Sequence, residues 1–340
     1  SVYDVAEDHV NKNLLFAGTE FGVFFSINGG KEWTQLKAGL PTIAVRDLEI
    51  QKRENDLVLG TFGRSFYVLD DYSTLRHFTA GDTAKPAILY PIKTALMFTE
   101  SRPLGGPGKA SQGESFFTTP NPPVGAVFTY MLNEELKTLK QKRQEAEKKI
   151  KKKKGDIYYP TPEELRLEDA EEKPYLLFVI KDADGKVVRR LKAKTTKGIQ
   201  RIVWDFRYPP TSPVVLVTKK PGRYGSADKG PMALPGTYNV TMYKVVNGVS
   251  TELVSPQSFE IKPLLHQTLP AESREDVLAF EKESGELYRN VSAAMRTIQD
   301  LENRLKYIKV AVQTTPSASL DMLTEVRSAE LAIDDIKIIV

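Results

Sequence analysis

A short segment near the start of the chain occurs twice. Residues 13–19 (NLLFAGT) recur as residues 55–61 (NDLVLGT), a spacing of 42 residues. The match continues on both sides of this segment, in two further pairs: residues 21–22 with 62–63, and residues 2–5 with 45–48. A unit that repeats at such a spacing packs against its own copies, so this repeat constrains the architecture more than any other feature of the sequence.

Each repeat unit is predicted to consist of short β-strands separated by polar or glycine turns. Aromatic and β-branched residues mark the strands at 2–7, 14–19, 23–27 and 33–36, and again at 45–50, 57–61 and 66–70. A period of roughly 40–45 residues with about four strands is typical of one blade of a β-propeller. We therefore predict that residues 1–80 are the last two blades of a propeller. Two blades leave sheet edges that proteins normally protect, so we expect the remaining blades in an upstream segment or a separate chain.

The turn before the fourth strand reads SINGGKEW and resembles the Asp-box of bacterial neuraminidase-type repeats, S-x-D-x-G-x-T-W. Ser26, Gly30 and Trp33 match, whereas Asn28 replaces the Asp and Glu32 replaces the Thr. A short Asn oxygen can accept N–H groups within its own turn, and glycine permits a positive φ. The indole supplies an apolar surface for packing. We interpret the motif as a structural turn, with ligand contact as the alternative.

Asp-box propellers occur in sialidases, xyloglucan-type glycoside hydrolases and the sortilin family. The runs GTEFG at 18–22 and GTFGR at 60–64 look most like bacterial sortilin-like propeller proteins, which are often labelled glycosyl hydrolases. This resemblance implies an exported bacterial protein, located outside the cell, on its surface or in the periplasm. Eukaryotic sortilins follow the propeller with a Cys-rich module, but this chain has no cysteine. The resemblance is therefore to the propeller alone.

The sequence assigns no catalytic, cofactor-binding or metal-binding residue. With no cysteine, a Cys-ligated metal site is excluded, and the three histidines are far apart in sequence, so we expect no His-based metal site. A glycosidase needs two acids about 5–10 Å apart, and no spacing identifies such a pair among the acids of the repeat, which include Asp4, Asp47, Asp70 and Asp71. Arg64 is the one candidate ligand contact, because it follows Gly63 at the start of a strand and can grip a carboxylate bidentately. An inter-blade salt bridge is the alternative for Arg64.

The middle of the chain is predicted to be a β-sandwich. Residues 81–123, with a Gly/Pro-rich run at 103–113, read as a linker. Alternating strands then follow, with hairpin signals at Asp184-Gly185 and Asn247-Gly248. Seven strands of this kind predict an immunoglobulin-like sandwich over residues 124–265. The pattern resembles the immunoglobulin-like modules of the flagellar hook-capping protein and of exported bacterial proteins.

An insertion of helical composition, residues 133–173, interrupts this sandwich. Residues 133–154 hold ten basic and four acidic side chains, a local charge of +6, but no aromatic interleaving, so we expect no nucleic-acid site. Thr161 and Glu164 form a capping box that begins a second, acidic helix. We expect the two helices to pack antiparallel as an arm, fixed by burial of three leucines at its base: Leu136, Leu139 and Leu165.

The C-terminal part is predicted to be an antiparallel helical hairpin over residues 266–340. Apolar or small residues from Val277 to Val312 recur at spacings of 3 and 4, which is typical of a coiled-coil seam, and a second such run spans 322–340. We expect the unpaired start of the first helix, with Val277, Phe280 and Leu287, to contact another domain or subunit. No apolar run reaches the roughly 18 residues of a membrane span.

Three functions stay open. The first is an exported sortilin-like protein that binds protein or glycan or acts as a scaffold, with this chain as its non-catalytic C-terminal part. The second is a sialidase- or glucanase-like glycoside hydrolase whose active site lies mainly in other blades. The third is a structural component that docks through the helical hairpin.

Overall fold

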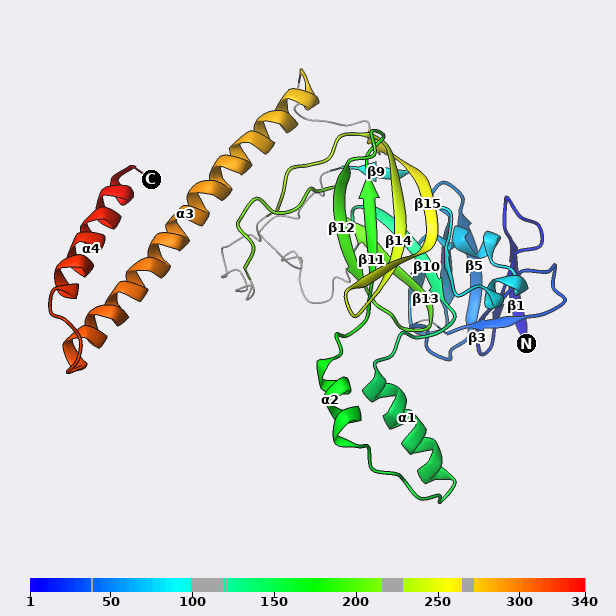
Figure 1. The fold of residues 1–340 in the computed structure, drawn as a ribbon. Coiled ribbons are helices and arrows are strands. Elements are labelled where there is room, and N and C mark those ends of the chain that lie inside the picture. The colour runs from blue at the N-terminus through cyan, green and yellow to red at the C-terminus, as the bar shows by residue number, and fades with distance from the viewer. Residues whose placement is uncertain (38, 99–118, 120, 216–228, 265–271, 340) are drawn as a thin grey trace. The chain divides into compact units, whose positions relative to one another are not determined.

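The computed structural model describes residues 1–37, 39–98, 119, 121–215, 229–264 and 272–339 (Figure 1). These residues form mainly β-sheets with a few helices. The chain divides into two compact units, Ser1–Asp205 with Pro235–Leu264, and Phe206–Leu234 with Leu265–Val340. The run predicted at 103–113 lies outside the described residues. No helix in the described part of the chain is both long and apolar enough to cross a membrane.

The first unit begins with two antiparallel sheets in which neighbouring strands follow one another in sequence. The first sheet contains β1 (Val2–Glu7), β2 (Leu15–Thr19), β3 (Gly22–Ser26) and β4 (Thr34–Leu36). The second contains β5 (Val45–Gln51), β6 (Asp56–Thr61) and β7 (Phe66–Leu69). The strands predicted from the repeat are thus confirmed, with bounds that differ by at most one residue.

The repeat extends to the pairing of the strands. The register of β1 against β2 shifts between Val2 and Asp4, and the register of β5 against β6 shifts at the matching place, between Val45 and Asp47. An irregularity of this kind locally bends a strand and strengthens its twist. The two sheets are therefore structural copies of one unit.

The two sheets pack face to face around a shared apolar core. The buried residues of this core are Leu14, Phe16, Val23, Val45, Leu48, Ile50, Leu57, Leu59 and Tyr72. Tyr72 lies in η1 (Tyr72–His77), a 3₁₀ helix after the second sheet, and its ring packs edge-on against Phe16 at 5.0 Å. Side chains from both copies and from the segment that follows thus close a single core.

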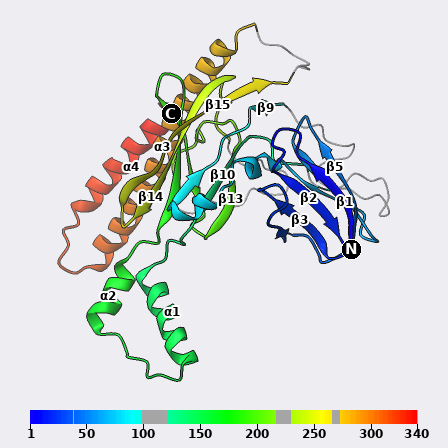
Figure 2. The ribbon, with the colours of Figure 1, turned by 90° about the vertical axis from the view of Figure 1, so that its right-hand side faces the viewer.

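Two further sheets complete the first unit (Figure 2). One has the order β13-β10-β8, and the other, which curls, has the order β12-β11-β14-β15-β9. Their strands are β8 (Ala87–Leu89), β9 (Ala95–Met97), β10 (Ala126–Leu132), β11 (Tyr175–Lys181), β12 (Val187–Ala193), β13 (Gly198–Trp204), β14 (Gly236–Val246) and β15 (Val249–Pro263). The Asn247-Gly248 hairpin is confirmed: Val246 pairs with Val249, and both turn residues have positive φ.

Buried aromatic rings fill the space between these two sheets. Phe128 of β10 lies 5.2 Å from Phe259 of β15, and Trp204 of β13 lies 5.2 Å from Tyr238 of β14. Edge-to-face ring pairs of this kind stabilise a core by about 0.5–1.5 kcal/mol beyond the area they bury. The two sheets are therefore held together by aromatic contacts.

The range expected as a linker, 81–123, contributes β-structure as well. β8 pairs with β10, and β9 pairs in parallel with the end of β15. The 3₁₀ helix η2 (Ala80–Ala84) precedes them. A strand of three residues is too short to show the alternation of apolar and polar residues that reveals a strand in the sequence. β8 and β9 are strands because they pair with longer neighbours in the sheet.

The insertion forms two helices that lie side by side (Figures 1 and 2), α1 (Leu139–Lys152) and α2 (Pro162–Ala170). The predicted capping box at Thr161 is present. Arg143 of α1 donates two hydrogen bonds to Glu168 of α2, at 2.6 and 2.8 Å, so the expected pairing of opposite charges is confirmed. The expected burial of Leu139 is wrong: its side chain is 45% exposed, because ion pairs rather than apolar contacts join the helices here.

The second unit contains α3 (Arg274–Thr314) and α4 (Met322–Ile339), which pack against each other. Ile298 and Val312 of α3 and Val326 and Ile333 of α4 are buried, so the helical hairpin is confirmed. The predicted seam is buried only in part, and four of its other positions are exposed: Leu301, Ile308, Met322 and Ile336. In the first half of α3 the buried positions are instead Leu278 and Gly285.

A non-helical segment of the same unit, residues 206–215, covers the first half of α3. Arg289 donates hydrogen bonds to the carbonyls of Thr211 and Pro210, at 3.1 and 3.2 Å. The Lys282 ammonium lies 4.1 Å from the centre of the Tyr208 ring. Within this unit Val277, Phe280 and Leu287 stay exposed, and their contact with another domain or subunit stays a prediction.

Candidate functional site

The Asp-box-like turn is closed by its own hydrogen bonds. The Ser26 hydroxyl, which is buried, donates to Asn28 Oδ1 at 2.9 Å and accepts the Gly30 N–H at 2.9 Å. Asn28 Oδ1 also accepts the Glu32 N–H at 2.9 Å. The φ of Gly30 is 87°, and the Trp33 indole N–H donates to the carbonyl of Gly30 at 3.0 Å. The polar atoms of the motif thus hold the turn, and the Trp33 ring and the Glu32 side chain are exposed.

Arg64 lies in the turn between β6 and β7. The turn is held by a hydrogen bond from the Thr61 hydroxyl to the carbonyl of Ser65, at 2.6 Å. Gly63 and Ser65 both have positive φ, at 77° and 59°, and Arg64 between them is exposed. This turn corresponds to the β2–β3 turn of the first sheet, whereas the Asp-box-like turn joins β3 to β4. The two candidate features therefore lie at opposite ends of their sheets and are not brought together.

A stacked cluster that the sequence analysis missed lies at the same end as Arg64. The Arg46 guanidinium is 4.1 Å from the centre of the Tyr3 ring and 5.3 Å from that of the Phe62 ring. We name these three side chains the aromatic rim; the rings of Tyr3 and Phe62 are exposed. A guanidinium on an aromatic face gains about 0.5–1 kcal/mol at an exposed site. The only sequence signal is an Arg and two aromatic residues at strand ends.

The aromatic rim joins the two copies of the repeat. Tyr3 belongs to β1, Arg46 to β5 and Phe62 to the β6–β7 turn, so its members are separated in sequence and meet only because the two sheets stack. Flat, partly exposed rings can pack against a sugar ring or an aromatic side chain, and the guanidinium beside them can pair with a carboxylate.

At the end of the second sheet, the carboxylates of Asp56 and Asp71 accept hydrogen bonds from backbone N–H groups. Asp71 caps η1 by accepting from the Ser73 N–H at 3.2 Å, and its own N–H donates to Asp56 Oδ1 at 2.9 Å. Burial raises the pKa of Asp70, and the nearby carboxylate of Asp56 adds to the shift. Arg201 of β13 donates to the carbonyls of Asp70 and Asp71, at 2.8 and 2.6 Å. These contacts anchor the repeat to the neighbouring sheet.

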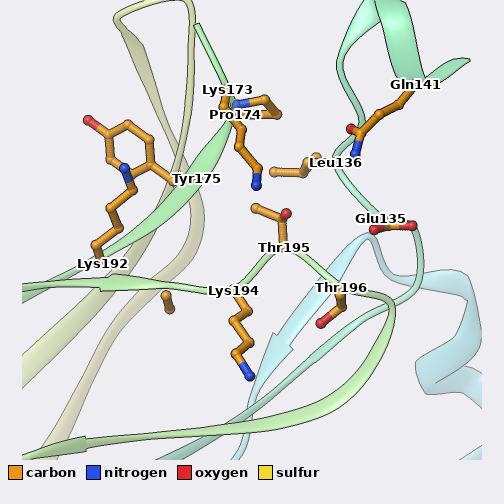
Figure 3. A pocket seen from close by; sticks show the side chains of 11 residues that line it. Glu135, Leu136, Gln141, Lys173, Pro174, Tyr175, Lys192, Lys194, Thr195 and Thr196 are labelled. Carbon is orange, nitrogen blue, oxygen red and sulfur yellow. The ribbon is translucent and has the colours of Figure 1, made fainter.

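A cavity of about 340 Å³ lies at the base of the helical arm (Figure 3). Its lining includes three lysines, Lys173, Lys192 and Lys194, and the hydroxyls of Thr195 and Thr196. Lys173 reaches toward Thr195 in Figure 3, and the Lys192 ammonium lies 4.2 Å from the centre of the Tyr175 ring.

The charge around this cavity favours an anion. Glu135 is the acid in its lining, and its carboxylate lies 3.6 Å from the ammonium of Lys137. The lysines come from the segment before β11 and from β12 and its end, so no local motif reveals them. Among the residues the structure describes, no group of three or more His, Asp or Glu is placed to hold a metal ion.

Comparisons with known proteins give no family assignment. No protein-family model matches the chain, and no curated protein matches it. PorZ, an essential bacterial surface component of the type-IX secretion system of Porphyromonas gingivalis, is 15% identical with a TM-score of 0.19, over 77% of this chain and 30% of PorZ.

A second solved structure is the extracellular domain of a hybrid two-component system from B. thetaiotaomicron. It is 11% identical with a TM-score of 0.17, over 78% of this chain and 25% of that structure. This chain therefore spans less than a third of the length of either structure. Both proteins are bacterial and are named as surface or extracellular components, but similarity this low carries no argument about the function of this chain.

Proposed function

We propose that this chain is the non-catalytic C-terminal part of an exported, sortilin-like propeller protein that binds protein or glycan and acts as a scaffold. The observation that carries the proposal is the stacking of two sheets that repeat each other in sequence and in register shift. Sheets that stack face to face at a constant sequence spacing are how propeller blades are arranged. Residues 1–80 are then the last two blades, and the other blades are the chief partner.

The remaining parts follow the same proposal. Residues 81–123 connect the blades to an immunoglobulin-like sandwich at 124–265 and add β8 and β9 to its sheets. The sandwich carries the arm at 133–173, and residues 266–340 form the hairpin. Support for the sandwich comes from Trp204, which is fully buried between two β-sheets, as in immunoglobulin domains. The location we propose is outside the cell, on its surface or in the periplasm.

Ligand contact is assigned to the end of the sheets that carries the aromatic rim. Arg64 is exposed in the turn next to Phe62, and the Arg46 guanidinium already lies against two rings. We propose that Arg64 binds a carboxylate of the ligand while the rings supply apolar contact. The Asp-box-like turn keeps a structural role in this proposal, because its polar atoms bond to one another.

One observation favours the second function, a glycoside hydrolase. The pKa of Asp70 is raised, mainly by burial, and a carboxylic acid with a raised pKa is what a glycosidase uses to protonate its leaving group. A second carboxyl, Asp56, is near enough to contribute to that shift. Both groups lie at the strand end that Arg201 anchors, however, which suits a structural role.

The two functions are separated by binding and turnover measured on the same protein. We expect the full-length protein to bind acidic glycans or peptides and Arg64→Ala to weaken that binding. The matched control Arg53→Ala, whose side chain is 82% exposed at the other end of the second sheet, should leave binding unchanged. Sialosides and β-glucans should show no turnover. Turnover that is lost in Asp70→Ala, Asp71→Ala or Asp47→Ala at an unchanged melting temperature would establish the hydrolase instead.

A further inference from the structure

The outward face of the second sheet exposes positions that the first sheet buries. On β7, Phe66 and Val68 are 71% and 52% exposed. Phe66 pairs with Gly60, just as Val23 of β3 pairs with Gly18, so Phe66 and Val23 hold the same place in the repeat. Val23 is 0% exposed. The two copies differ because the second sheet covers the first, whereas no described residue covers the second.

The glycines of the repeat show how close the covering sheet lies. A Cβ on Gly18 would come within 2.8 Å of the carbonyl oxygen of Val45, so the backbone of β5 rests directly on this glycine. Gly60 holds the same position in the second sheet. A Cβ there would meet only its own sheet, with the Asp47 Cβ at 3.3 Å as the nearest atom. In the first sheet, glycine at this position lets the backbone of β5 approach closely. The second sheet has a glycine at the same position, Gly60, although no described strand approaches it.

A polar contact joins the sheets at the same level. Asp4 Oδ2 accepts the backbone N–H of Leu48 from the covering sheet, at 2.8 Å. Asp47 is the copy of Asp4 in the second sheet, and it is exposed. The outward face of β5–β7 therefore carries the same three elements that the first sheet uses to bind its neighbour: an acceptor carboxylate, a bare glycine and an apolar strand.

One difference between the copies defines the partner further. Glu49 stands on β5 where Ala6 stands on β1, and it is exposed on the outward face. A sheet that covers this face must place a basic or polar side chain opposite Glu49, or leave Glu49 at the rim of the contact, since an unpaired buried carboxylate is costly.

We propose that the outward face of β5–β7 binds a further sheet of the same repeat, supplied by the same polypeptide outside these 340 residues. The first strand of that sheet rests on Gly60 and donates a backbone N–H to Asp47, as β5 does to Asp4. This inference rests on the proposed propeller and adds to it the face, the register and the residues of the next contact.

These 340 residues contain no cysteine, so one engineered thiol within them, followed by peptide mass spectrometry, probes this face in both proteins. Val68→Cys should react with a maleimide rapidly in the isolated 340-residue chain. In the full-length protein the same thiol should react more slowly, by about tenfold or more. Tyr158→Cys, at a position in the arm that is 86% exposed, is the control and should react equally in both. Equal reactivity of Val68→Cys in the two proteins would overturn the proposal.

A second pair of variants tests the polar contact without a label. Asp47→Ala should lower the melting temperature of the full-length protein by about 2–4 °C and leave that of the 340-residue chain unchanged. Asp4→Ala should lower it in both, because its partner Leu48 is present in both. If Asp47→Ala leaves the melting temperature of both proteins unchanged, the assigned register is wrong.

A second copy of the chain is the alternative occupant of this face, and the same thiol distinguishes it. If Val68→Cys becomes protected in the 340-residue chain as concentration rises, with a matching increase in mass by light scattering, a second copy covers the face and the proposal is wrong. All labelling is done without ligand. A protein that fails to bind glycan or peptide but protects Val68→Cys would refute the binding function and leave this contact standing.

Discussion

Arg76 holds the carboxylate of Asp8 with two hydrogen bonds across 68 residues of sequence, from Nε to Oδ2 at 2.8 Å and from Nη2 to Oδ1 at 2.7 Å. The Tyr72 hydroxyl donates to the same carboxylate at 2.6 Å, and the Asn11 N–H at 2.7 Å. The Asp8 side chain is 0% exposed. This buried network ties the loop after β1 to η1, and so it locks together the two ends of the repeat segment.

Acid should remove the stability that this network supplies. Burial alone raises the pKa of Asp8, but hydrogen bonds from Arg76, Tyr72 and Asn11 outweigh it and lower the pKa from 3.8 to about 2. A carboxyl whose pKa is lower in the folded state stabilises the fold above its unfolded pKa. This stability is lost as the pH falls from about 4 toward 2, and it amounts to about 2 kcal/mol. Urea unfolding at several pH values, compared with Asp8→Asn, measures it. A difference between the two proteins that stays constant below pH 4 would count against this assignment.

Removing the Arg76 cation alone should destabilise the fold more than removing both charges of the Asp8–Arg76 pair. Arg76→Met leaves a buried carboxylate without its ionic partner, so we expect the free energy of unfolding to fall by about 3–5 kcal/mol. The double variant Asp8→Asn/Arg76→Met should recover part of that loss, and the exposed Arg53→Ala should change stability by less than about 0.5 kcal/mol. Denaturant unfolding gives all three values. A single Arg76→Met that is as stable as the double variant would show that the charge is not the cause.

The repeat segment could be predicted well because its local signals agree. Strands rich in aromatic and β-branched residues, turns with glycine, and one register repeated at 42 residues all indicate the same structure. The Thr161 capping box likewise marked the start of α2 within one residue. Where a few neighbouring residues decide a feature, the sequence is enough to find it.

The features that were missed depend on distant partners. β8 and β9 are strands only because β10 and β15 pair with them. The heptad pattern of α3 predicts an apolar stripe along the helix. It does not show that the part around Gly285 packs against residues 206–215 and not against a second helix. The aromatic rim and the lysine-lined cavity assemble from separate segments whose order in the sequence gives no hint of their meeting.

The arm should come apart locally without unfolding the rest of the first unit. Arg143 joins α1 to α2 through Glu168 and also pairs with Glu147. Neither helix has a buried residue, so the ion pairs are their main connection. Arg143→Gln should speed backbone hydrogen exchange in both helices, and added salt should have a similar effect in the wild type. The control Arg304→Gln breaks an exposed pair within α3 and should leave exchange in the arm unchanged. Protection of α1 and α2 that survives Arg143→Gln would mean that apolar contacts hold the arm.

Gly285 lies in the middle of α3, where glycine is unfavourable by roughly 1 kcal/mol relative to alanine. A Cβ at this position would come within 2.5 Å of Thr211 Cγ2. Gly285→Ala should therefore strengthen the helix but push away the segment that crosses it, and we expect the clash to dominate. Faster hydrogen exchange over residues 206–215 is the measurement.

A second substitution separates the clash from the helix propensity. Thr211→Ala removes Cγ2 and keeps the backbone carbonyl that Arg289 binds. In the double variant Gly285→Ala/Thr211→Ala the clash is relieved while the gain in helix propensity remains. The protein should then be at least as stable as Thr211→Ala alone, and residues 206–215 should regain their protection. If Gly285→Ala by itself stabilises the chain and leaves exchange in 206–215 unchanged, the close approach of this segment to the helix is wrong. The glycine would then be a weak point of α3 with no packing role.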